Sequence, residues 1–117
     1  MNNEKHETYC NYNLTNLLTK SGFDWQDYFV AHSIDEHFHW EIPLHIAQRW
    51  LREVKNISVD ISSTRYSEWE YIIRKINQLN NKDSTILALT ACKFYTYEEA
   101  LEAGIKEALE LILEKGE

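Results

Sequence analysis

Two histidines separated by one residue are the side chains in this sequence best suited to chemistry. His37 and His39 flank Phe38, and Glu41 follows two residues later. On a β-strand alternate side chains point to the same face, so both imidazoles would point in one direction. Imidazole nitrogens bind zinc and related metals, and Glu41 or His45 could add a ligand. One hypothesis is therefore a metal-binding protein that uses His37 and His39.

The same histidines also have a structural interpretation. A strand near the edge of a sheet normally presents one polar, solvated face, and Phe38, Trp40 and Ile42 would then form its apolar face. No third metal ligand is assigned by spacing. We therefore predict no metal, no cofactor and no catalytic residue as the primary interpretation.

A basic strip in the middle of the chain is the second candidate. The net charge of −7 disfavours a phosphate backbone as partner, and three glutamates lie among the basic residues. An alternative function is nevertheless a nucleic-acid-associated module that uses this middle segment. Its residues would be Arg49, Arg52, Lys55, Arg65, Arg74 and Lys75.

Aromatic residues form the third candidate. The chain has 4 Trp, 7 Tyr and 4 Phe, which is more than one modest core needs. Some of them could line an interface with a protein partner or with a second copy of the chain. The candidates are Tyr9, Tyr12, Trp25, Tyr28, Tyr66 and Trp69.

Catalytic signatures are missing from the sequence. There is no glycine-rich phosphate loop and no G-x-S-x-G turn, and Cys10 and Cys92 lack neighbouring motif residues. Two cysteines without a C-x-x-C pair indicate reduced thiols. Without a signal-like N-terminus or a long apolar run, we expect a cytoplasmic protein that is not embedded in a membrane.

The elements that would position these residues form one domain, 1–117, of α+β class. We expect a loose arm over 1–12 and a helix plus hairpin over 13–42. Asn13 would cap the helix and Gly22 would end it. The hairpin strands would cover 28–33 and 37–42. Residues 43–115 are predicted to form an α-β-β-β-α unit, the order found in double-stranded RNA-binding domains.

Within that unit Pro43 opens an amphipathic helix with an apolar stripe from Ile46 to Val54, and Asn56 ends it. Strands are predicted over 57–61, 68–76 and 85 to about 94. The third is nearly all apolar or small, as expected for a central strand that is covered on its faces. Thr96 and Glu99 form a capping box that starts the last helix. An antiparallel meander with both helices on one face would bury these stripes.

Three segments carry a resemblance: Ile42-Pro43 leading to Trp50-Leu51-Arg52-Glu53-Val54-Lys55-Asn56-Ile57, Thr96-Tyr97-Glu98-Glu99-Ala100, and Leu17-Leu18 before Gly22-Phe23. Together they resemble an uncharacterised family of short proteins encoded by intestinal bacteria and their prophages or mobile elements, over roughly residues 14 to 113. The family has Thr after the proline, where this chain has Leu44. The resemblance implies a bacterial or phage origin, an accessory role inside the cell and no established activity. Our leading interpretation is a non-catalytic macromolecular-interaction module, with a homodimer as one possibility.

Overall fold

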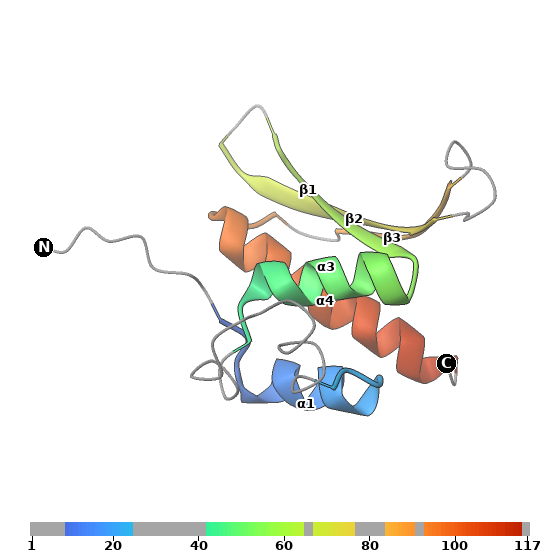
Figure 1. Cartoon of the computed structure of the whole chain (residues 1–117). Helices are drawn as coiled ribbons and strands as arrows, with labels where there is room; N and C mark the ends of the chain where they lie inside the picture. The colour runs from blue at the N-terminus through green and yellow to red at the C-terminus, as the bar shows by residue number, and fades with distance from the viewer. Residues whose placement is uncertain (1–8, 25–41, 65–66, 77–83, 91–92, 116–117) are drawn as a thin grey trace, which may run out of the picture.

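The computed structural model describes residues 9–24, 42–64, 67–76, 84–90 and 93–115, which are coloured in Figure 1. The elements are α1 (Tyr12–Lys20), α3 (Leu44–Val54), β1 (Ile57–Ser63), β2 (Trp69–Ile76), β3 (Ser84–Leu89) and α4 (Tyr97–Glu114). The predicted α+β class and the order of helix, three strands and helix are confirmed. Apart from Ile42, the predicted hairpin lies outside the described residues.

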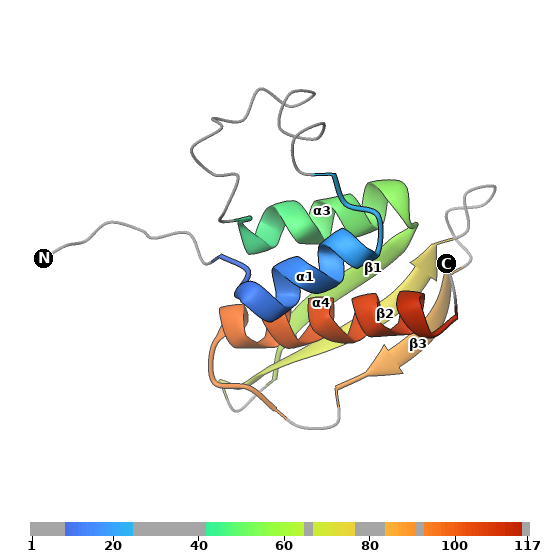
Figure 2. The ribbon, with the colours of Figure 1, turned by 90° about the horizontal axis from the view of Figure 1, so that it is seen from below.

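The elements stack in three layers, as Figures 1 and 2 show. The sheet forms one outer layer, α3 and α4 lie against one of its faces, and α1 packs on the far side of α4. Contacts of α3 with β1, of α4 with β1 and β2, and of α1 with α4 define this arrangement. The prediction that both helices cover the same face of the sheet is confirmed.

The sheet is an antiparallel meander in the order β1-β2-β3, so β2 is central and β3 lies at an edge. The prediction of a central third strand reaching residue 94 is therefore wrong. The strand ends at Leu89, and Phe94 forms only an isolated bridge with Trp69. The apolar residues of this strand are not all covered: Leu87 and Ala88 pack on the core, whereas Ile86 and Leu89 are exposed.

A β-bulge interrupts the pairing of β3 with β2. Ile73 pairs with Ala88 and Arg74 pairs with Ile86, so Leu87 is an extra residue without a partner in β2. Leu87 and Ala88 both contact the core, although neighbouring residues of a regular strand point to opposite faces. The bulge therefore changes which residues of β3 face away from the helices.

Helix α4 lies at the centre of the core. The predicted stripe is buried, and it comprises Leu101, Ile105, Ala108, Leu109 and Ile112. The predicted cap is confirmed, because Thr96 Oγ1 accepts the N–H of Glu99 at 3.1 Å and the Glu99 carboxylate accepts the N–H of Tyr95 at 3.3 Å. Gly104 lies on the buried side of this helix, where α4 passes close to Val59 and Tyr71.

The first helix begins earlier than predicted. Asn11, and not Asn13, is its N-cap, because the Asn11 side chain accepts the N–H of Leu14 at 2.8 Å. Cys10 is buried and donates its N–H to the Ile42 carbonyl at 2.8 Å, so the expected loose arm does not extend over residues 9–12. The helix ends as predicted, with Gly22 at φ 105°.

Helix α3 and the turn after it follow the predicted pattern with one exception. Ile46, Ala47, Trp50 and Leu51 are buried, but Val54 is 53% exposed in the last turn. Asn56 adopts φ 58° after the helix, a left-handed conformation that Asn tolerates better than most residues.

Candidate functional site

The predicted metal ligands are not brought together in the described part of the chain. His37, His39 and Glu41 lie outside the described residues, and His45 is exposed in the first turn of α3. Among residues 9–24, 42–64, 67–76, 84–90 and 93–115, no group of three or more His, Cys, Asp or Glu side chains could hold a metal ion.

The basic residues of the middle segment do not form one strip. Arg74 lies on the face of the sheet opposite the helices, where its guanidinium is 2.7 Å from the Asp60 carboxylate. Arg49 belongs to α3, on the other side of the sheet, and pairs with Glu53 at 3.1 Å. Arg65 lies outside the described residues. The arginines are thus divided between two faces, and two of them are neutralised by a carboxylate.

Cys10 is a buried thiol. Burial, and to a smaller extent the nearby negative charge of Glu102, raise the pKa of this thiol to about 12, against a smaller lowering by a backbone hydrogen bond. The thiol is therefore protonated at neutral pH. Because the thiolate is the nucleophilic form of cysteine, Cys10 is unsuited to nucleophilic catalysis.

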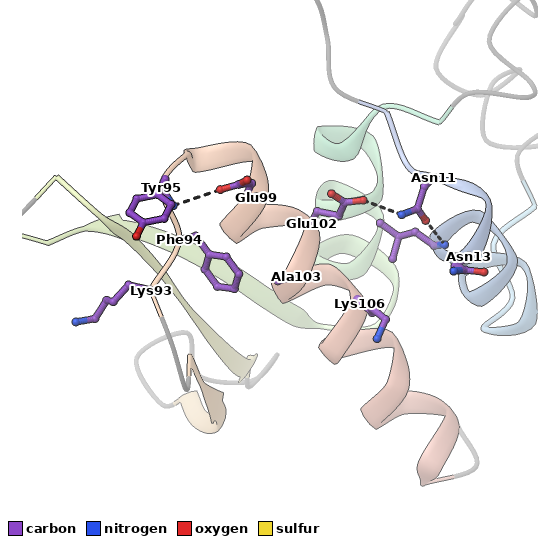
Figure 3. Close-up of a pocket in the computed structure, with 10 residues that line it drawn as sticks. Asn11, Asn13, Lys93, Phe94, Tyr95, Glu99, Glu102, Ala103 and Lys106 are labelled. Carbon is purple, nitrogen blue, oxygen red and sulfur yellow. Dashed lines mark hydrogen bonds between the residues drawn. The ribbon is translucent and has the colours of Figure 1, made fainter.

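A groove of about 460 Å³ lies between the start of α1, the segment before α4 and the first half of α4, as shown in Figure 3. Leu14, Phe94 and Ala103 supply its apolar lining, and charged groups of both signs surround them. The described residues that line it are Asn11, Asn13, Leu14, Lys93, Phe94, Tyr95, Glu99, Glu102, Ala103 and Lys106.

The carboxylates of this groove have structural partners. Glu102 accepts a hydrogen bond from the Asn11 side chain at 3.0 Å, and Glu99 accepts the N–H of Tyr95. Lys106 pairs with Glu110 at 3.1 Å. The described residues of the lining include neither His nor Cys. The contacts of Glu102 and Glu99 hold α1 and the start of α4 in place, and among the described residues of the groove no nucleophile lies beside a base for catalysis.

The face of the sheet opposite the helices is divided into a polar and an apolar half. Next to β1, Asp60 accepts hydrogen bonds from Arg74 and, at 2.6 Å, from Ser58. Next to β3, Ile72 pairs with Leu89 and Ile86 pairs with Arg74, and paired residues share a face. Ile72, Ile86 and Leu89 therefore form an apolar strip along the β3 side.

The apolar strip is open to solvent. Ile86 is 54% exposed and Leu89 is 59% exposed, and no described element packs on this face of the sheet. A regular strand would send residues 86 and 89 to opposite faces, because three is an odd number of steps. The bulge at Leu87 places both on the same face.

The two edges of the sheet differ in their protection. At the outer edge of β1, the Val59 carbonyl accepts a hydrogen bond from the Gln48 side chain of α3 at 2.8 Å. At the outer edge of β3, no described residue pairs with the backbone. Ser84–Leu89 also contains no charged residue and no proline, which natural edge strands often carry against unwanted pairing. Among the described strands, β3 therefore has the less protected edge.

Three of the six aromatic residues predicted to line an interface belong to the described part of the chain. Tyr12 is 81% exposed, whereas Tyr9 and Trp69 are half-buried. Trp25, Tyr28 and Tyr66 lie outside the described residues. The exposed aliphatic residues of β3, which sequence reasoning assigned to a covered strand, form a more continuous apolar surface.

The chain matches no protein-family model, no curated protein and no solved structure. Among the described helices, none has both the length and the apolar character needed to cross a membrane.

Proposed function

We propose that this protein is a non-catalytic interaction module that binds a protein partner through the outer edge of β3 and the apolar strip beside it. One observation carries the proposal. Ile86 and Leu89 are more than half exposed on an edge strand whose outer backbone has no described partner. An exposed apolar edge of this kind pairs readily with a strand of another chain.

A protein partner suits this surface better than a nucleic acid does. Binding to a phosphate backbone depends on unpaired basic side chains. On this face Arg74 is paired with Asp60, and the neighbouring strand β3 is uncharged. The surface therefore offers backbone hydrogen bonds and aliphatic contacts, which are the groups that a β-strand of another protein uses.

We further propose that the protein acts in the cytoplasm. Support comes from the buried, unpaired Cys10 thiol, which is compatible with a reducing compartment.

Photo-crosslinking inside the cells that make the protein tests the interaction. A benzophenone amino acid replaces Leu89, and in a matched control it replaces Val54, which is 53% exposed on α3. We expect a covalent protein adduct from position 89 that is absent from position 54 and is lost when Ile86→Lys is added. Equal adducts from both positions, or none from position 89, would contradict the proposal.

A further inference from the structure

We infer that the partner of β3 is β3 of a second copy of this chain, in a two-fold dimer with one specific register. This inference rests on the proposed function, because it names the occupant of the same edge. In the dimer Ile86 of each copy lies opposite Leu89 of the other copy, and Leu87 lies opposite Ala88. The two sheets would then join into one.

The direction of the backbone groups in β2 supplies the first step. Ile76 donates its N–H to the Asn56 carbonyl at 2.8 Å, on the β1 side, whereas the Tyr71 carbonyl accepts the N–H of Thr90 at 3.1 Å, on the β3 side. In an antiparallel sheet these directions alternate from residue to residue. Even-numbered residues of β2 therefore face β1, and odd-numbered residues face β3.

The outward groups of β3 follow from this alternation. Ile72 and Arg74 turn their backbone N–H and C=O groups toward β1, so their pairs with Leu89 and Ile86 are not hydrogen-bonded pairs. Ile86 and Leu89 consequently turn their own N–H and C=O groups to the outer edge. No described residue contacts these groups. Ser84, which pairs with Ile76, turns its backbone groups outward for the same reason. The outward-facing residues of β3 are therefore Ser84, Ile86 and Leu89, and the last two are three positions apart instead of two.

This spacing selects the partner. A regular strand presents its hydrogen-bonding residues two positions apart, so it can satisfy Ile86 or Leu89 but not both in register. A strand with the same bulge, running antiparallel, has the same three-residue spacing. A second copy of β3 meets this requirement, because it places Ile86 opposite Leu89 twice.

The side chains match in the same register. The side chains of Leu87 and Ala88 point toward the helices, whereas those of Ile86 and Leu89 lie on the opposite face of the sheet. This pattern is unchanged when the strand is reversed, so each pair in the dimer joins side chains on the same face. Ile72, Leu89 and the second copy's Ile86 would form one continuous apolar row across the joined sheet.

Charge and size set the expected strength. Each copy carries a net charge of −7, but Ser84–Leu89 is uncharged, so the repulsion between copies arises away from the contact. Salt screens such repulsion and should strengthen the dimer. Pairing through one short strand buries an area at the small end of specific interfaces, below about 1,200 Å², which is typical of transient complexes.

Sedimentation equilibrium tests the dimer. The full chain is examined up to about 500 µM, a range that covers weak association, at about 50 and 500 mM NaCl. We expect an average mass that rises above 13.9 kDa with concentration, and more steeply at the higher salt. Ile86→Lys and Leu89→Glu should each remain at the mass of one chain. Val54→Lys, which makes the same change at a position of equal exposure on α3, should behave like the unaltered protein.

Mixing the two single variants tests the register. An equal mixture of Ile86→Lys and Leu89→Glu should associate at least tenfold more tightly than either variant alone, because Lys at 86 then faces Glu at 89 and the second pair remains Leu89 with Ile86. Circular dichroism of each variant checks that it is folded. An unaltered protein that stays at the mass of one chain, or a mixture without recovery, would overturn the inference. If position 89 still crosslinks to a different protein, only the identity of the partner fails and the proposed function stands.

Discussion

Replacing Gly104 with alanine tests how closely α4 packs on the sheet. An added Cβ would lie 2.7 Å from Val59 Cγ1 and 3.1 and 3.2 Å from the Tyr71 Cγ and Cβ atoms. Carbon atoms in contact prefer about 3.5–4.0 Å, so the helix or the sheet must shift. Neither neighbour can withdraw easily, because Val59 is 2% exposed and Tyr71 also donates a hydrogen bond to Glu107.

Two opposing contributions determine the size of the effect. Overpacking of a core costs about 1–3 kcal/mol, and a 2.7 Å contact places this site in the upper part of that range. Alanine gains about 1 kcal/mol over glycine in a helix interior. We therefore expect Gly104→Ala to lower the free energy of unfolding by about 1–2 kcal/mol. The melting temperature of a domain of this size should fall by about 4–8 °C.

Urea unfolding followed by circular dichroism measures this loss, and a second substitution identifies its cause. Val59→Ala removes the closest atom, so in that background Gly104→Ala should cost about 1 kcal/mol less or even stabilise the protein. If Gly104→Ala stabilised the unaltered protein by the full helix-propensity gain, or if its effect were the same in both backgrounds, the close-packing argument would be refuted.

Two further predictions concern residues just before α1 and α4. Unfolded Cys10 loses its proton above pH 9.0 whereas the folded thiol keeps it to about pH 12, so stability falls as pH rises between these values. The free energy of unfolding of the native protein, measured relative to Cys10→Ala in urea, should fall by about 1.4 kcal/mol from pH 8 to pH 10, and a pH-independent difference would contradict this assignment. Thr96→Ala should cost about 1 kcal/mol by removing the cap of α4, whereas Thr96→Ser should cost little; equal losses would show that the hydroxyl is not the stabilising group.

The helices were predictable because their signals are local. The stripe from Leu101 to Ile112 and the Thr96 cap depend on spacings within one or two turns, and both are present in the structure. The Glu99 side chain differs from the predicted capping box, because it accepts the N–H of Tyr95 and not that of Thr96. The first cap was misplaced because Asn11 and Asn13 are locally equivalent as caps. Asn11 also donates a hydrogen bond to Glu102 of α4, and a contact with so distant a residue cannot be read from local sequence.

The candidate site was not predictable for a related reason. A run of apolar residues such as Thr85–Leu89 is typical both of a central strand and of an exposed edge, because composition does not specify which strands flank it. The bulge is also a property of pairing, since Leu87 is extra only relative to Ile73 and Arg74 of another strand. Nothing in the sequence therefore indicated that Ile86 and Leu89 share one exposed face.

The position of α4 between the sheet and α1 has a consequence for synthesis on the ribosome. Helix α4 is the last of the described elements to leave the exit tunnel, yet α1, α3, β1 and β2 all pack against it. Until it emerges, Leu14 of α1 and Val59 of β1 lack neighbours that they have in the folded protein. The faces of α1, α3, β1 and β2 that pack on α4 therefore stay uncovered in the nascent chain until this helix is translated, and a chaperone that binds apolar surface would act during that interval.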